Sequence, residues 1–226
     1  LEQTTAVARL VMDPIVVSGL VEGRALTISN ADISFGGANV SNGHVTAKGS
    51  VAVRGVDLGG PLVFDAHGSR TSAALSLKSE RLAADLAAER AGGVYRLTKP
   101  ARATLRLHPA LLDAFEVRSD WMGGDLAIVM DASQLEIPTD LALDRMKMDF
   151  GVTIAQAVLR SEGREVTLKN AKLGASCAAG DLIVKGAGEV GDGKFDLSAR
   201  VRRWIKGTDV NRDAPIEAQL TSHDIP

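Results

Sequence analysis

The chain has few aromatic residues and a single cysteine. Only 4% of its 226 residues are Phe, Trp or Tyr although 45% are hydrophobic, so its apolar residues are mostly small or aliphatic. Cys177 has no second cysteine to pair with, which excludes an intrachain disulfide. No segment approaches the run of about 18 uncharged apolar residues typical of a membrane-spanning helix. The net charge of −2 gives no electrostatic footprint for nucleic acid.

Candidate catalytic and metal-binding residues are scattered. The small neighbours of Cys177 include no basic group that would lower the pKa of its thiol. No two histidines are close neighbours in the sequence, as clustered zinc ligands would be: His44, His67, His108 and His223. We therefore predict a protein that is not an enzyme, with no metal site and no cofactor.

Two charged segments have both a functional and a structural interpretation. The three carboxylates of residues 140–149 alternate with Leu and Met, as in a strand whose charges face solvent rather than a pair of catalytic acids: Asp140, Asp144 and Asp149. The basic residues around Trp204 could contact an anionic headgroup or a nucleic acid, but they also fit a solvated strand end: Arg200, Arg202 and Arg203.

A twelve-residue phrase occurs twice in the chain. Residues 22–33 (EGRALTISNADI) return 140 residues later as 162–173 (EGREVTLKNAKL). Each copy is followed by a strand-like segment that carries a Lys-Gly step, Lys48-Gly49 or Lys185-Gly186. Such repetition indicates similar supersecondary units that stack on one another. We expect two β-meander halves, residues 1–122 and 123–226, in which the segment 22–54 is matched by 162–190.

Apolar and polar residues alternate along most of the chain, which predicts many short strands. The predicted strands are 6–12, 25–35, 44–54, 62–67, 72–78, 82–89, 94–97, 102–107, 125–131, 147–155, 162–173, 182–190, 195–201 and 216–220. Residues 109–115 are predicted to form one short helix, because Pro109 suits a first helical position and apolar residues follow at helical spacing. In both copies of the phrase the apolar positions change face at the Asn, which predicts a bulge at Asn30 and Asn170.

These patterns predict an all-β fold, an antiparallel meander that forms a groove or an open sandwich. A sheet made of Val, Leu, Ile and Ala exposes an apolar strip unless something covers it, and an acyl chain could cover it without any polar group. The alternative is that the two halves pack face to face as an ordinary sandwich. The candidate groove residues precede or pair with the shared Asn: Leu26, Ile28, Val45, Val166, Leu168 and Ile183.

Residues 24–54 and 164–202 resemble the C-terminal repeats of bacterial AsmA-like proteins, which include TamB-like proteins and are akin to bridge-like lipid-transfer proteins. The resemblance rests on the phrase [Leu/Val]-Thr-[Ile/Leu]-x-Asn-Ala, a Gly-flanked turn and an apolar strand with Lys-Gly. Residues 95–112, a strand leading into a short Pro-x-Leu-Leu turn, also resemble these proteins. The resemblance implies an elongated, curved sheet whose concave apolar face holds phospholipid acyl chains between the two membranes of a Gram-negative envelope.

The resulting hypothesis is a non-catalytic lipid-handling or scaffold segment of a larger envelope protein. It implies an indirect partnership with phospholipid or membrane, no nucleic acid, and a periplasmic location with an inner-membrane anchor in sequence outside this chain. Because strands 6–12 and 216–220 would be open edges, we expect flanking sequence or another chain to continue the sheet. The alternative is a repetitive surface protein, either a β-solenoid adhesin or a carbohydrate-active β-helix, which the 23 Gly residues also suit.

Overall fold

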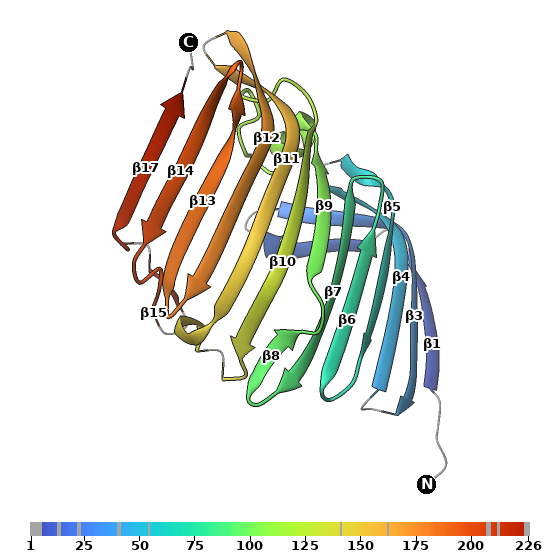
Figure 1. Cartoon of the computed structure of the whole chain (residues 1–226). Helices are drawn as coiled ribbons and strands as arrows, with labels where there is room; N and C mark the ends of the chain where they lie inside the picture. The colour runs from blue at the N-terminus through green and yellow to red at the C-terminus, as the bar shows by residue number, and fades with distance from the viewer. Residues whose placement is uncertain are drawn as a thin grey trace. The chain divides into compact units, whose positions relative to one another are not determined.

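The fold is an antiparallel β-meander, seen in a computed structural model of the chain (Figure 1). The structure describes residues 6–12, 15–21, 24–39, 42–53, 55–140, 142–161, 163–206, 209–211 and 213–223. Fifteen strands belong to one sheet, and two short strands form a second sheet. The predicted all-β class is confirmed. A β-helix stacks its strands in parallel, so the antiparallel pairing gives that alternative no support.

Strands make up most of the described chain. In the first part they are β1 (Ala6–Met12), β2 (Ile15–Val21), β3 (Arg24–Asn39), β4 (Asn42–Val53), β5 (Val56–Gly68), β6 (Ser72–Lys78), β7 (Leu82–Ala91), β8 (Val94–Leu97) and β9 (Ala101–Leu107). The helix α1 (Pro109–Ala114) follows. The remaining elements are β10 (Leu126–Pro138), the 3-10 turn η1 (Leu143–Arg145), β11 (Lys147–Ser161), β12 (Arg164–Ala178), β13 (Asp181–Val190), β14 (Gly193–Val201), β15 (Ile205–Lys206), β16 (Asp209–Val210) and β17 (Ile216–His223).

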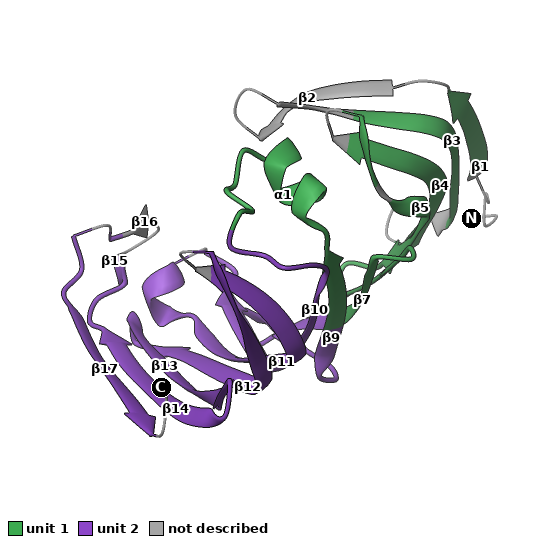
Figure 2. Cartoon of the chain, turned by 90° about the horizontal axis from the view of Figure 1, so that it is seen from above, with its two compact units in different colours: residues 1–87, 103–120 green, residues 88–102, 121–226 purple. Residues whose placement is uncertain are grey.

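The chain divides into two compact units (Figure 2). Unit 1 comprises residues 1–87 and 103–120, and unit 2 comprises residues 88–102 and 121–226. Unit 1 thus ends two residues before the expected boundary after residue 122. The segment 88–102, expected in the first half, belongs to unit 2 because β8 pairs with β10.

In unit 1, β3 pairs with other strands on both of its sides. Its residues 31–37 pair with β1, its residues 24–28 pair with β2, and its other side pairs with β4. The sheet continues through β5 and β6 to β7. Figure 2 shows α1 on the concave side of this sheet.

The helix α1 begins as its sequence predicts. The side chain of His108 accepts a hydrogen bond from the amide of Ala110 at 3.2 Å, and Pro109 follows the cap. Leu111 and Ala114 are buried, which anchors the helix to unit 1.

In unit 2, the long hairpin of β11 and β12 pairs from Met148–Cys177 at one end to Ser161–Arg164 at the other. The sheet continues in order through β13, β14 and β17, and β10 pairs with the other side of β11. The strands alternate between exposed and more buried residues, so each sheet face has its own composition.

Both copies of the repeated phrase carry the predicted bulge. Asn30 in β3 and Asn170 in β12 have φ angles of 53° and 51°, in the left-handed region that Asn tolerates. The register with the following strand, β4 or β13, shifts at the same point. The apolar residues on either side of the Asn therefore share one face of the sheet.

A glycine lies opposite each bulge. A Cβ on Gly49 would lie 3.4 Å from the Cα of Ala31, and a Cβ on Gly188 would lie 3.0 Å from the Cα of Ala171. Both alanines are buried. The structural counterpart of Gly49 is therefore Gly188 rather than Gly186, which the shared Lys-Gly step had paired with it in the sequence.

Candidate functional site

The sheet of unit 1 has an apolar inner face. Ile33 of β3 lies beside Ala47 of β4, which lies beside Phe64 of β5, and Gly49 lies beside Leu62. Cross-strand neighbours point to the same side of a sheet, so these side chains form one continuous surface. The inner face of unit 1 comprises Ile28, Ala31, Ile33, Val45, Ala47, Gly49, Val51, Leu62 and Phe64.

A groove of about 220 Å³ runs along this face. Its lining residues are Ile28, Ala31, Ile33, Ala47, Lys48, Gly49, Val51, Leu62 and Phe64. Lys48 is the one charged residue among them, and its cross-strand neighbours Asp32 and Val63 belong to the opposite face. Because Gly49 has no side chain, the floor of the groove lies close to the backbone of the bulge in β3. The groove is an apolar channel with almost no hydrogen-bonding group.

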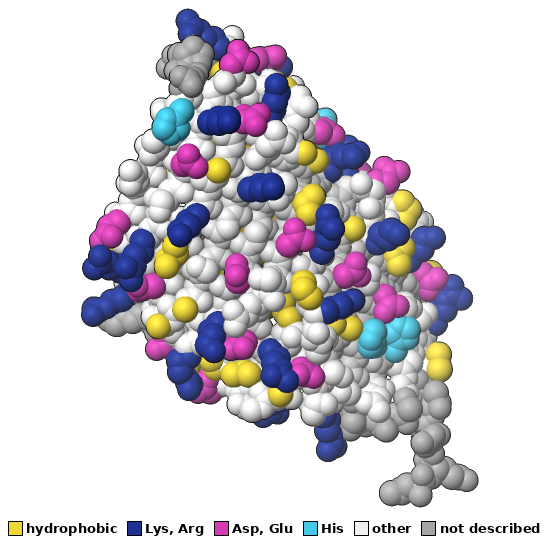
Figure 3. All heavy atoms as spheres, in the orientation of Figure 1, with side chains coloured by type: hydrophobic (Ala, Val, Ile, Leu, Met, Phe, Trp, Pro, Cys, Tyr) yellow, Lys and Arg dark blue, Asp and Glu magenta, His cyan; other side chains and the backbone are white. Residues whose placement is uncertain are grey.

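The outer face of the same sheet is polar. Arg9 donates two hydrogen bonds to Asp32, at 2.8 and 2.5 Å, and the nearby ammonium of Lys48 also favours the ionised carboxylate. The pKa of Asp32 is therefore lowered, first by the hydrogen bond from Arg9. Figure 3 shows this face, where basic and acidic side chains are interspersed.

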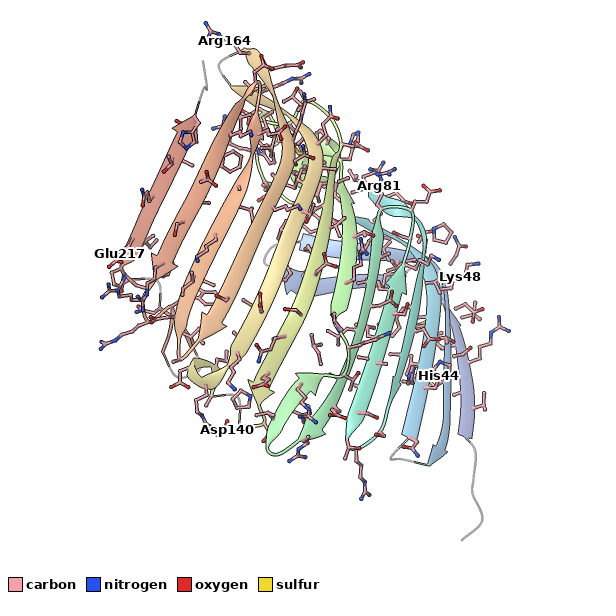
Figure 4. All side chains as sticks on the ribbon, in the orientation of Figure 1. His44, Lys48, Arg81, Asp140, Arg164 and Glu217 are labelled. Carbon is pink, nitrogen blue, oxygen red and sulfur yellow. The ribbon has the colours of Figure 1, made fainter. Side chains whose placement is uncertain are left out.

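A second outer-face cluster joins two histidines to one carboxylate. Nε2 of His44 lies 3.1 Å from Asp65, and Nδ1 of His67 lies 3.7 Å from the same carboxyl group. The hydrogen bond with His44 is the main cause of a lowered pKa at Asp65. The strand register brings together His44 and His67, which are far apart in sequence, as direct cross-strand neighbours. Figure 4 labels His44 on β4.

Nothing in the described residues marks the histidine cluster as a metal site. Among the described residues, no group of three or more His, Cys, Asp or Glu side chains is arranged to hold a metal ion. The imidazoles and the carboxylate are about half exposed, so the cluster is a solvated polar surface.

Unit 2 also has an apolar inner face. Phe150 of β11 lies beside Ala175 of β12, which lies beside Val184 of β13 and Ala199 of β14. A second row runs from Val152 through Leu173 and Gly186 to Leu197 and Leu220. These rows contain no charged residue, whereas the intervening rows carry Lys172, Lys185, Asp196 and Arg200.

One end of the unit 2 inner face is closed by a connecting segment. The amide of Ile205 donates to the carbonyl of Gly180 at 3.2 Å, which holds β15 over the turn after β12. Ile205 is buried, and Cys177 of β12 is buried as well. Burial raises the pKa of the Cys177 thiol, and the charge of Asp181 raises it further, so the thiol is protonated at neutral pH.

Four of the six sequence-predicted groove residues lie on an inner face, but of these four only Ile28 lines the groove. Ile28 and Val45 lie on the inner face of unit 1, and Val166 and Leu168 lie on the inner face of unit 2. Leu26 pairs through its backbone with Val53 of β4, but its side chain lies outside the described residues.

Ile183 requires a correction. It was expected on the apolar face, but its cross-strand neighbours are Ser176 and Arg200, and it is 38% exposed. The register therefore turns the Ile183 side chain to the polar face, while its neighbours Leu182 and Val184 face inward.

The other sequence candidates do not converge on one site. Asp140 accepts a hydrogen bond from the amide of Ala142 and pairs with Arg145, so it fixes the turn before β11, and its pKa is lowered first by that amide. Asp149 lies on the outer face of β11, opposite Ser176. Two of the three arginines form ion pairs, Arg200 with Asp181 at 2.7 Å and Arg202 with Glu217 at 2.9 Å.

Sequence reasoning missed Leu62 and Phe64, which line the groove from β5. Their signal was present, since Leu62, Phe64 and Ala66 alternate with polar or exposed positions. The predicted groove residues were confined to the two phrases and the strand that follows each phrase, and β5 lies one strand further along the sheet.

Comparison with protein-family models, characterised proteins and solved structures gives no match. Within the described residues, no helix is both long and apolar enough to span a membrane.

Proposed function

We propose that this chain is a non-catalytic lipid-handling segment whose apolar inner faces hold phospholipid acyl chains, as the resemblance to AsmA-like and TamB-like proteins implies. On this proposal the segment works in the periplasm, as part of a longer envelope protein that is anchored in the inner membrane outside this chain. The observation that carries the proposal is the apolar groove on the inner face of unit 1.

The chemistry of the groove suits a hydrocarbon chain. An extended peptide brings backbone amide and carbonyl groups that would need hydrogen-bond partners, and burying them without partners is costly. An acyl chain has no such groups, and each methylene that leaves water contributes about 0.8 kcal/mol. The volume of about 220 Å³ is below the roughly 300–1,000 Å³ of sites for drug-sized molecules, so it suits part of a chain rather than a whole lipid.

The partial exposure of the apolar side chains also supports the proposal that an apolar ligand binds. Among the described residues few apolar side chains are fully buried, and most of the inner-face residues are only half-buried. A ligand that covers these faces removes apolar surface from water, which favours binding.

The test compares two neighbouring residues of β5. Phe64→Glu places a charge in the groove, while Val63→Glu places the same charge on the outer face, where Val63 is 46% exposed. Phospholipid that co-purifies with the chain in gentle detergent is measured by native mass spectrometry. We expect lipid on the unmodified chain and on Val63→Glu, and a loss of about tenfold or more on Phe64→Glu, because a carboxylate in an apolar groove strongly disfavours an acyl chain.

The same comparison in unit 2 is Leu168→Glu against Lys169→Glu, which also change adjacent residues on opposite faces. Circular dichroism shows whether each variant keeps its strands. An unmodified chain that carries no lipid, or a folded Phe64→Glu chain that keeps its lipid, would show that the groove does not hold acyl chains.

A further inference from the structure

The strand β17 is an open edge of unit 2. Its eight residues pair with β14 without a bulge, from Val201–Ile216 to Lys194–His223. Within the described part of the chain no strand pairs with its other side, and it is the last strand of the sheet (Figure 1). Ile216 and Leu220 are 70% and 69% exposed. They extend the apolar inner face of unit 2 to the edge.

Proteins usually protect such an edge against pairing with another chain. Common protections are Lys, Pro, a bulge or a very short strand. The sequence of β17, IEAQLTSH, contains neither Lys nor Pro, and its register is regular over the whole strand. A long, regular edge with alternating apolar residues is a surface for strand addition.

We propose that β17 pairs with the β17 of a second copy of this chain, antiparallel and with the twofold axis at Leu220. In this register Glu217 lies opposite His223 of the second copy, and Gln219 lies opposite Thr221. Each outer-face pair then joins a hydrogen-bond donor to an acceptor. On the inner face Leu220 meets its own counterpart, and the apolar surface of unit 2 continues from one copy into the other.

Two other arrangements of the same strand are less complementary. A parallel pair of the same two edges would turn the inner face of the second copy to the opposite side of the sheet, so the apolar surfaces of the two copies would not continue into one another. An antiparallel pair centred on Gln219 would place Glu217 opposite Thr221 and Ala218 opposite Leu220. It loses both the contact of Glu217 with His223 and the contact between the leucines.

Another edge strand in the described part of the chain, β1, is a poorer match for self-pairing. Its outer face carries Val7 and Val11 on either side of Arg9, and Leu10 lies on its inner face, so apolar residues lie on both faces. Self-pairing centred on Arg9 would place two guanidinium groups opposite each other. Pairing of β17 with β1 of another copy is head-to-tail, which produces open chains rather than closed dimers.

The register can be tested with one engineered disulfide. Leu220→Cys places two thiols directly opposite at the twofold axis, where cross-strand Cβ atoms lie about 4.5–5.5 Å apart. Ala218→Cys is the matched control, because residue 218 lies opposite Ser222 and not opposite itself. Cys177 is only 2% exposed and does not compete. Under mild oxidation we expect a cross-linked dimer, twice 23.7 kDa, from Leu220→Cys and monomer from Ala218→Cys.

A charge exchange tests the non-covalent dimer. Glu217→Lys alone would place a lysine opposite His223, and His223→Glu alone would place two carboxylates opposite each other. Either substitution should raise the dimer dissociation constant about fivefold or more. The double variant should restore it. General damage to β17, or loss of the ion pair of Glu217 with Arg202, would not be reversed by the second substitution. Dissociation constants come from light scattering over a concentration series.

Three results would overturn the proposal. The unmodified chain could remain a monomer at all concentrations, or Ala218→Cys could cross-link as fast as Leu220→Cys. The chain could also form open-ended polymers that a charge on β1 abolishes, as with Val11→Lys, which would identify head-to-tail pairing instead. A closed dimer with restoration in the double variant supports β17 self-pairing.

Discussion

Asp181 shows how a single side chain fixes a connection between strands. At the start of β13 its carboxylate accepts a hydrogen bond from the backbone amide of Arg203 at 2.9 Å and one from the guanidinium of Arg200 at 2.7 Å. It thereby attaches the segment after β14 to the start of β13. Its pKa is lowered, mainly by the amide of Arg203 and then by Arg200.

This lowered pKa predicts a pH-dependent contribution to stability. The interactions of Asp181 stabilise the fold fully above its unfolded pKa of about 3.9, and this contribution is lost as pH falls through the lower folded pKa. We expect Asp181→Asn to reduce Tm near neutral pH, with a difference from the unmodified chain that shrinks in acid. Circular dichroism melts across the acid range measure it.

Asp196→Asn is the control for that experiment, because it removes one negative charge from the outer face of β14. The control should show no such shrinking difference. A Tm deficit of Asp181→Asn that stays constant down to the most acid pH would contradict the assignment.

At the scale of the strand, the two units share one feature, a β-bulge at Asn30 in β3 and at Asn170 in β12. It keeps the apolar residues before and after the Asn on one face of the strand, and the glycine opposite makes room for the buried Ala that follows the Asn. The Asn is required for its backbone angle, and at position 170 its side chain also donates to Glu189 at 3.4 Å.

Substitution of Asn170 should therefore depend on backbone preference rather than on polarity. Asn170→Gly should change the free energy of unfolding little, because Gly adopts a positive φ without strain. Asn170→Val should lower it by about 1–2 kcal/mol, the cost of a left-handed conformation for an ordinary residue. Urea unfolding measures both. Lys169→Val, next to the bulge, controls for the loss of a polar side chain, and equal effects of Gly and Val at 170 would refute the explanation.

The sequence predicted the strands and bulges well because both have local signals. Alternation located β6 and β8 to the residue, and the face switch located both bulges. The strand β2 was missed because Pro14 and Gly19 indicate breaks. The Ala- and Leu-rich segment of β7 also fits a helix in isolation, and pairing with neighbouring strands decides its conformation.

The candidate site was less predictable because a face depends on register. Leu182, Ile183 and Val184 are three consecutive apolar residues, so local sequence cannot say which of them faces inward. Pairing with β12 and β14 turns Ile183 outward. The match of Gly49 with Gly188 also needs the register, since a shared Lys-Gly step pointed to Gly186.

At the scale of the whole molecule, each unit combines an apolar inner face with a polar outer face. The outer face of unit 1 balances Arg9 and Lys48 with Asp32, and neighbouring basic and acidic groups recur in unit 2, as in the pair of Arg200 with Asp181. Figure 3 shows the two signs of charge interspersed. Such a surface keeps a sheet soluble without creating a strong field, which agrees with the net charge of −2.

Because the chain divides into two units, its tryptophan fluorescence reports on one unit only. Both tryptophans, Trp121 and Trp204, belong to unit 2, so unit 1 emits no tryptophan signal. In a urea titration the emission should follow unit 2 alone, whereas far-ultraviolet dichroism follows the strands of both units. We expect Asn30→Val to move the dichroism transition and leave the emission midpoint in place, and Asn170→Val to move the emission midpoint. Equal shifts of both signals with Asn30→Val would mean that the two units unfold as one.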